Sequence, residues 1–145
     1  MKPKRIRVIA ICAIRSGKGI LVFEGFDSVK DTFFYRPLGG GVEPGETSEE
    51  AVTREILEEV GLELRAVRLL GVLENLFHLE GDPHHEIVFV YEGHFRDELA
   101  NQRDEFIVKE DNGYTSRATW RDLSSFDDRH RLVPEELLGI LQRSI

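Results

Sequence analysis

The sequence predicts an α+β fold, a three-layered sandwich built around a mixed β-sheet. Apolar, β-branched runs open the chain, a helical segment with clear start and stop signals follows, and further extended segments lead to a second helix. Strands and helices in this order are typical of a sheet that is covered by helices. The chain has 145 residues, of which 41% are hydrophobic and 32% charged, so it fits one globular domain over residues 1–145.

The first third of the chain predicts a hairpin, a third strand and a loop. Ile6–Ile14 is rich in β-branched residues and predicts a strand. The turn Ser16–Gly19 leads to a returning strand over Gly19–Glu24, and a third strand is expected over Thr32–Leu38. Gly39–Glu46 holds four glycines and a proline in eight residues, which predicts a loop with special backbone conformations.

A helix is expected over Ser48–Val60. Thr47 is a good N-cap, and Glu50 completes a Thr-x-x-Glu capping box. Gly61 stands where a left-handed residue commonly ends a helix.

The second half predicts more strands and a terminal helix. Leu64–His78 is expected to form one long or two short strands, and Glu86–Tyr91 and Thr115–Leu123 one strand each. Arg96–Asp111 is polar and predicts a loop with at most a helical turn. Pro134–Ile145 predicts an amphipathic helix with Pro134 at its first position.

Charge and cysteine content narrow the function classes. The net charge of −8 argues against a nucleic-acid partner, which needs clustered Lys and Arg. A small phosphorylated substrate stays open, because a divalent cation can lie between an acidic protein and an anion. The single cysteine, Cys12, lies in an apolar run and is expected to be buried and unreactive. The apolar stretch Val8–Ile14 is too short for a signal peptide or membrane span, so no membrane association and a cytoplasmic location are expected.

Three glutamates share one face of the predicted helix. At about 100° per residue, with Glu55 at zero, Glu58 falls at roughly −60° and Glu59 at roughly +40°. Such neighbouring like charges destabilise a helix unless something compensates them. A hard divalent cation such as Mg²⁺ or Mn²⁺ turns the repulsion into binding, because carboxylate oxygens are its preferred ligands. An apolar stripe beside these glutamates, expected to face the core, consists of Val52, Ile56, Leu57 and Val60.

These residues belong to a longer pattern. From Gly40 the chain continues with five residues, Glu46, seven residues, and Arg54-Glu55-Ile56-Leu57-Glu58-Glu59-Val60-Gly61-Leu62. This pattern resembles the Nudix box, with every fixed residue and both aliphatic positions present, and the flanking segments resemble the Nudix α/β/α sandwich with its mixed central β-sheet. The resemblance implies a metal-dependent pyrophosphohydrolase that cleaves a nucleoside diphosphate linked to another group. It also makes a homodimer an expectation, because dimers are common among such proteins.

The resemblance assigns roles within the box. It implies metal binding by the carboxylates of Glu55, Glu58 and Glu59 and by the backbone carbonyl of Gly39. Arg54, together with Glu46, is expected to orient the carboxylates. Glu55 or Glu58 would accept the proton of the attacking water, with the loop carboxylates Glu105 and Glu110 as alternatives.

On the substrate side, Arg36 lies just before the glycines and is expected either to face the phosphates or to form a structural salt bridge. His85 and Glu86 begin a strand and are expected to line the substrate cleft. Zinc binding by His84 and His85 is disfavoured, since adjacent strand residues face opposite sides.

The aromatic residues are expected to serve mainly the core. Trp120 is expected to pack in the core, with stacking on a base as the alternative. The other core candidates are Phe33, Phe34, Phe77 and Phe89.

The substrate and the rival functions stay open at this point. The downstream motifs typical of NADH, ADP-ribose and diadenosine polyphosphate hydrolases are missing, which slightly favours nucleoside di- or triphosphate-like substrates. A non-catalytic nucleotide-sensing module is the main alternative, although such modules usually show a degraded box and a partner domain. An isoprenoid diphosphate isomerase is less favoured, because Cys12 lies in a predicted first strand.

Overall fold

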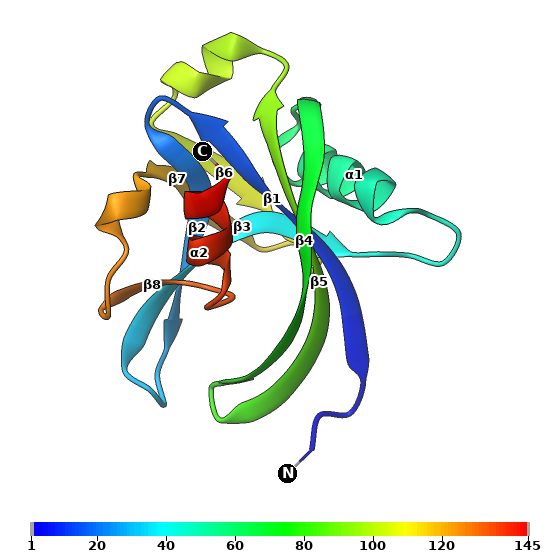
Figure 1. Ribbon diagram of the computed structural model, residues 1–145, viewed down its shortest axis with the longest axis vertical. Coiled ribbons are helices and arrows are strands. Elements are labelled where there is room, and N and C mark those ends of the chain that lie inside the picture. Colours follow the sequence, from blue (N-terminus) through cyan, green and yellow to red (C-terminus); the bar gives the residue numbers. More distant parts are fainter. Residues whose placement is uncertain (1, 145) are drawn as a thin grey trace.

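A computed structural model describes residues 2–144 (Figure 1). Met1 and Ile145, the ends of the predicted domain and terminal helix, lie outside the described residues. The elements, in chain order, are β1 (Ile6–Ser16), β2 (Gly19–Asp27), β3 (Thr32–Gly41), α1 (Ser48–Val60), β4 (Leu64–Leu79), β5 (Asp82–Phe95), the 3₁₀ helix η1 (Glu98–Gln102), β6 (Glu105–Lys109), β7 (Thr115–Arg121), the 3₁₀ helix η2 (Leu123–Ser125), β8 (His130–Leu132) and α2 (Leu137–Arg143).

The strands form one mixed sheet in the order β4-β5-β1-β3-β2-β7-β6, with β8 beside β3. β1 pairs with β5, and β3 with β8, in parallel, whereas the other pairs are antiparallel. One core cluster contains residues of α1 and the other contains residues of α2, so the two helices cover opposite faces of the sheet. The predicted three-layered α+β sandwich is therefore confirmed.

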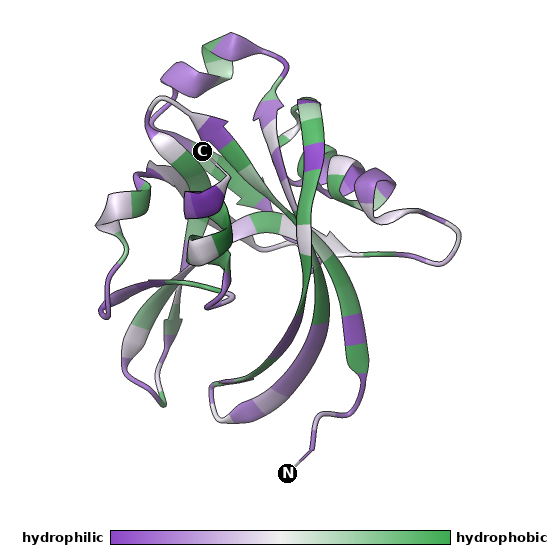
Figure 2. Cartoon of the chain, viewed as in Figure 1, coloured by the Kyte–Doolittle hydropathy of each residue, from purple (hydrophilic) through white to green (hydrophobic). Residues whose placement is uncertain are grey.

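The central strand β1 shows why the sequence adopts this arrangement. Ala10 and Cys12 pack in the cluster with α1, while Ile9 and Ile11 pack in the cluster with α2. A strand that is buried on both faces needs a continuous apolar run rather than alternation. The central strands are accordingly mostly hydrophobic and the connecting loops mostly hydrophilic (Figure 2). Cys12 is fully buried as expected, and burial raises the pKa of its thiol.

Helix α1 begins and ends where its sequence signals predict. The Thr47 side chain accepts from the backbone N–H of Glu50, and the Glu50 side chain accepts from the backbone N–H of Thr47. Gly61 caps the C-terminus with a φ of 72°. The expected apolar stripe is wrong at Leu57, which is 49% exposed, because the helix turns Glu55 rather than Leu57 towards the sheet.

Three predicted elements need correction. Gly39–Gly41 is not loop but the end of β3, because these glycines pair with Ile9–Ile11 of β1. Arg96–Asp111 contains strand β6, in which Phe106 and Val108 are buried, so this segment is not only loop. Helix α2 starts later than predicted, at Leu137, because Val133 still donates a backbone hydrogen bond to Tyr35 of β3.

The predicted core aromatics are partly wrong. Phe33 is 43% exposed, and the other three are only partly buried, because they lie on strands whose faces are not fully covered. Trp120 does pack against the core, edge-on to Phe95 and Phe106. Its indole N–H donates to the carbonyl oxygen of Arg103.

Within residues 2–144, the longest helix is the 13-residue α1, and neither α-helix has the length and apolar character that crossing a membrane requires.

Two hairpin tips are joined by one buried carboxylate. Asp27, which is 2% exposed, accepts hydrogen bonds from the backbone N–H groups of Val29, Lys30 and Glu80 at 3.0, 3.0 and 3.3 Å. The hydrogen bond from the Lys30 backbone N–H lowers the pKa of Asp27 below its ordinary value, although desolvation opposes this effect. The β2–β3 turn is thereby tied to the β4–β5 turn.

The first prediction concerns this carboxylate. A lowered folded-state pKa gives stability that is present above the unfolded pKa, about 3.9, and is lost as the pH falls through the folded value. We expect Asp27→Asn to lower the Tm at pH 7, and the difference from the wild type to shrink below about pH 4. The control is Asp31→Asn, in the same turn. A Tm difference that is equal at pH 7 and pH 3 would contradict the prediction.

The second prediction concerns the α1 cap. Thr47→Ala removes the acceptor for Glu50 and is expected to cost about 1 kcal/mol in the free energy of unfolding, measured by urea denaturation. Thr53→Ala, in the same helix, removes a hydroxyl that bonds only the Glu49 carbonyl and is expected to be neutral or stabilising. Equal losses in the two variants would contradict a contribution of the cap.

Candidate active site

The Arg54 guanidinium joins the carboxylates of the box. It donates to both carboxylate oxygens of Glu46 at 2.7 and 3.1 Å, to Glu55 at 3.1 Å and to Glu58 at 3.3 Å. It also donates to the backbone carbonyl of Gly41 at 3.1 Å, which ties α1 to the end of β3. The hydrogen bonds with Glu46, and then those with Glu55, raise the pKa of Arg54, although burial opposes them.

Two of the glutamates are buried. Glu55 is 7% and Glu59 8% exposed, on the side of α1 that faces β3. Burial raises the pKa of Glu55, although the Arg54 hydrogen bond opposes it. Burial and then repulsion from Glu55 raise the pKa of Glu59 to about 9. The protein therefore concentrates carboxylates where negative charge is costly in the absence of a cation.

A third carboxylate joins this group from another part of the chain. Oxygen atoms of Glu55, Glu58 and Asp111 all lie within 4.8 Å of one another. Asp111 belongs to the turn after β6, and α1 packs against β6. This set of oxygen atoms can hold a hard divalent cation.

A cavity of about 180 Å³ opens beside these carboxylates. Gly39, Gly40 and Gly41 form one wall, and a Cβ atom on Gly40 would lie 2.4 Å from Cδ of Glu55. The missing side chain therefore lets β3 approach the carboxylate. The charged residues that line this cavity are Arg7, Arg36, Glu55, Glu59, Lys109, Glu110 and Asp111.

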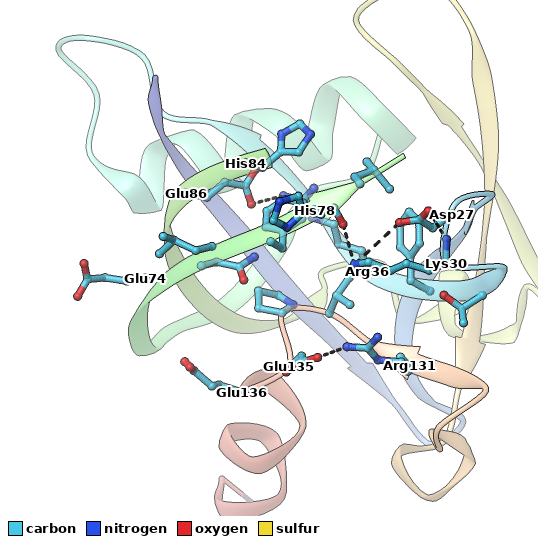
Figure 3. A pocket seen from close by; sticks show the side chains of 18 of the residues that line it. Asp27, Lys30, Arg36, Glu74, His78, His84, Glu86, Arg131, Glu135 and Glu136 are labelled. Carbon is cyan, nitrogen blue, oxygen red and sulfur yellow. Dashed lines mark hydrogen bonds and ion pairs between the residues drawn. The ribbon is translucent and has the colours of Figure 1, made fainter. Parts of the chain in front are cut away.

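A larger cavity, of about 450 Å³, lies next to it (Figure 3). The tips of the β2–β3 and β4–β5 hairpins and the segment before α2 line it. Arg7 and Arg36 line both cavities and so lie at their junction. Each forms a 3.7 Å ion pair with Glu86, which is 3% exposed. Arg131 and Glu135 form another ion pair in the wall of the larger cavity.

The structure brings together most of the predicted site residues. Glu46 and Arg54 lie beside the acidic group, and Gly39 and Glu59 line the smaller cavity. Glu58 does not line that cavity, but its carboxylate reaches those of Glu55 and Asp111.

The substrate-side candidates are divided. Arg36 and Glu86 line the larger cavity. His85 lines neither cavity, because it faces the opposite side of β5 from Glu86; the neighbouring His84 lines the larger one and stacks on Phe77.

The two alternative bases also differ. Glu110 lines the smaller cavity, and its carboxylate accepts a hydrogen bond from the Ser116 hydroxyl. Glu105 lies at the other end of β6, is exposed, pairs with Arg117 and lines neither cavity.

Three residues of the site were not predicted from the sequence. The sequence places Asp111 at the end of a polar segment and offers its neighbour Glu110 as the candidate carboxylate. Arg7 lies in the first strand and Lys109 at the end of the unrecognised strand β6. The signal that could have found Lys109 and Asp111 is the run Phe106-Ile107-Val108, whose aromatic and β-branched residues predict a short strand before the turn at Asp111.

The family is settled by comparison with known proteins. The sequence model of the NUDIX domain matches residues 3–138. The chain belongs to the NUDIX family. The resemblance found in the Gly40–Leu62 segment is thereby confirmed.

Curated NUDIX relatives match only part of the chain. An RNA pyrophosphohydrolase from Erwinia tasmaniensis is 53% identical over 36 residues, which cover 25% of this chain and 21% of that protein. The NAD-capped RNA hydrolase NudC from Mycobacterium tuberculosis is 38% identical over 93 residues, which cover 59% of this chain and 29% of that protein. The chain thus spans less than a third of the length of these relatives.

Solved structures match the whole fold. A MutT NUDIX hydrolase from Burkholderia pseudomallei superposes with a TM-score of 0.65 at 25% identity, over 96% of this chain and 98% of that one. A NUDIX hydrolase from Nitrosomonas europaea also gives 0.65, at 20% identity, over 97% and 90%. The fold is therefore that of NUDIX proteins, with the same arrangement of sheet and helices.

The third prediction tests the wall of the smaller cavity. A Cβ on Gly40 displaces the Glu55 carboxylate, whereas a Cβ on Gly41 meets nothing closer than 3.9 Å. We expect Gly40→Ala to weaken Mn²⁺ binding about tenfold or more, and Gly41→Ala to leave it nearly unchanged. Electron paramagnetic resonance measures free Mn²⁺, and circular dichroism checks the fold. Equal Mn²⁺ affinity in the two folded variants would contradict the prediction.

Proposed function

We propose that this NUDIX protein is a metal-dependent pyrophosphohydrolase that cleaves the phosphoanhydride bond of a nucleotide-type substrate, a nucleoside diphosphate linked to another group. The observation that carries this proposal is the group of Glu55, Glu58 and Asp111 oxygens, within 4.8 Å of one another and beside two cavities.

The donor set fits Mg²⁺ or Mn²⁺. Carboxylate oxygens are the ligands that these ions prefer, and burial of Glu55 makes a compensating charge favourable. Glu59 and the backbone carbonyl of Gly39, both at the smaller cavity, are the further ligands that the family resemblance implies. A bound divalent ion would offset charge on the phosphoryl oxygens and lower the pKa of a water molecule.

The residues of the chain have distinct tasks in this proposal. Arg54 holds the carboxylates of Glu55 and Glu58 in a fixed geometry and is itself held by Glu46. Glu58 accepts the proton of the attacking water at its carboxylate, which is 51% exposed and so open to a solvent molecule. Asp111 lies close enough to share this role or to bind the ion.

The larger cavity supports a substrate with a sizeable organic group. Its volume of about 450 Å³ is within the range of small-molecule sites. The names of the relatives bring RNA and NAD-capped RNA into consideration, whereas the net charge of −8 favours a small nucleotide. A cytoplasmic location, no nucleic-acid partner and a homodimer stay predictions from the sequence.

The fourth prediction tests hydrolysis. Phosphate release is measured with Mg²⁺ or Mn²⁺ and a coupled phosphatase on nucleoside triphosphates, ADP-ribose, dinucleoside polyphosphates and sugar nucleotides. The RNA product is measured separately for triphosphorylated and NAD-capped RNA. We expect metal-dependent turnover of one class, and a kcat about 10²- to 10⁴-fold lower in Glu58→Gln.

Two further variants make this test specific. Asp111→Asn tests whether the Asp111 carboxylate accepts the proton or binds the metal ion. We expect this variant to lower kcat or the affinity for Mn²⁺. Glu105→Gln makes the same change as Glu58→Gln at an exposed site that lines neither cavity, and is expected to keep kcat within about twofold. If no substrate is turned over while a nucleotide still binds, the non-catalytic sensor replaces the hydrolase as the proposed function.

A further inference from the structure

The arginines of this protein differ in how their guanidinium groups are satisfied. Arg54 donates hydrogen bonds to three carboxylates and a carbonyl. Arg121 donates to Ser125 and lies over the Tyr35 ring. In contrast, Arg7 and Arg36 donate no hydrogen bond to any group within residues 2–144, and each makes only a 3.7 Å ion pair with Glu86.

For Arg36 this arrangement is costly. Burial lowers the pKa of its guanidinium, and Glu86 only partly opposes this effect. A guanidinium has five N–H donors, and no nitrogen of Arg36 is fully enclosed without a partner, so these donors can reach solvent or a ligand. The Arg36 side chain is 26% exposed, and this exposed part faces the cavities that it lines. Its donors are therefore open to a ligand.

The position of the pair specifies where that ligand lies. The parallel pairing of β1 with β5 sets Arg7 beside Glu86. Arg36 lies on β3 beyond Leu38, the last residue that pairs with β1, and its side chain reaches the same carboxylate. Both arginines line both cavities, whereas Glu86 lines only the larger one. An anion at this junction would contact the two arginines with the acidic group on one side and the larger cavity on the other.

The two guanidinium groups at this junction share one close carboxylate. Each lies 3.7 Å from Glu86, whereas Glu59 and Glu110 act on Arg36 from the smaller cavity. Arginine is well suited to phosphate, because its planar fork donates two parallel hydrogen bonds to two oxygens.

We propose that Arg7 and Arg36 together bind the phosphate that stays attached to the organic part of the substrate, and that Glu86 is a positioning counter-charge rather than a substrate ligand. This proposal rests on the proposed hydrolysis in one respect. It assumes that the second phosphate of the substrate lies beside the acidic group of Glu55, Glu58 and Asp111. The ligand class is a 5′-phosphorylated nucleoside, carried as the organic half of a larger diphosphate.

Two features of the larger cavity support a planar organic group there. Gly25 leaves room for the Phe34 ring, since a Cβ at Gly25 would lie 2.2 Å from Cζ of Phe34. Phe77 and His84 also line this cavity, and their rings stack with centroids 5.0 Å apart and an interplanar angle of 11°. Aromatic faces of this kind stack on bases of any identity. They therefore suit a nucleoside without selecting one base.

The test is binding of nucleoside monophosphates without any divalent metal. Isothermal titration calorimetry in EDTA measures the Kd of adenosine and guanosine 5′-monophosphate, with adenosine and inorganic phosphate as comparison ligands. We expect a monophosphate to bind the wild type. We expect Arg36→Gln and Arg7→Gln each to raise its Kd at least about tenfold, and Arg36→Lys to weaken binding because it keeps the charge but loses the fork.

The controls separate a phosphate site from general effects of charge and stability. Arg117→Gln makes the same change at a 74% exposed side chain that lines neither cavity, and is expected to leave the Kd unchanged. Arg36→Gln removes one partner of the buried Glu86 and can lower the Tm, so Arg7→Gln, at a 44% exposed side chain, is the second variant. Glu86→Gln removes the competing carboxylate and is expected to lower the Kd.

The outcomes are distinct from those of the hydrolysis test. Unchanged Kd values in folded Arg36→Gln and Arg7→Gln, or no metal-free binding of either monophosphate, would overturn the proposal. A higher Kd in folded Glu86→Gln would overturn the role given to that carboxylate. Because neither metal nor turnover enters this measurement, monophosphate binding that depends on the arginines can hold even if hydrolysis fails, and the converse is equally observable.

Discussion

The site depends on the interaction of one guanidinium with a set of carboxylates that would otherwise repel one another. Neighbouring glutamates on a helix destabilise it, and burial of two of them adds a desolvation cost. Arg54 offsets part of both effects, since it bonds Glu46, Glu55 and Glu58 while it anchors α1 to the Gly41 carbonyl. The charges in this network do not balance, because one guanidinium faces three carboxylates. In our proposal, the uncompensated negative charge makes a divalent cation a favourable ligand there.

The same site also needs a strand and a helix to approach unusually closely. Gly39 has a φ of 153°, and a Cβ there would lie 2.1 Å from the Ala10 carbonyl oxygen, so β3 can lie against β1 only without a side chain. Gly40 likewise lets β3 approach α1, because a Cβ atom there would clash with the Glu55 carboxylate. The glycines therefore act as parts of a strand packed between two neighbours, and not as a flexible loop. This explains why so much glycine is compatible with regular pairing here.

Much of the fold and most of the site could be predicted because the signals are local. The cap at Thr47, the left-handed Gly61 and the spacing of Arg54 with the glutamates are all set within one helix and its flanks. Asp111 and Arg7 could not be found in this way, since only strand pairing and the packing of α1 on β6 bring them to the site. Strand β6 is short, and its apolar triplet Phe106-Ile107-Val108 lies between charged residues, so the segment as a whole resembles a polar loop. His85 shows the opposite failure: its place in the strand was predictable, but which of two neighbouring residues faces the cavity was not.

An acidic protein that acts on an anion must separate its charges in space. With a net charge of −8, long-range attraction does not favour a phosphorylated ligand, and the screening length of about 8 Å at physiological salt limits this effect to short distances. Within that distance the site has two kinds of surface: a group of carboxylates that we propose binds a cation, and the Arg7–Arg36 pair, whose donors form no hydrogen bond within residues 2–144. A diphosphate fits such a surface better than a single phosphate, because it can place one phosphate against each kind. In our proposal, specificity for a phosphoanhydride therefore comes from the spacing between an acidic and a basic subsite, and the aromatic walls of the larger cavity act only on the group beyond it.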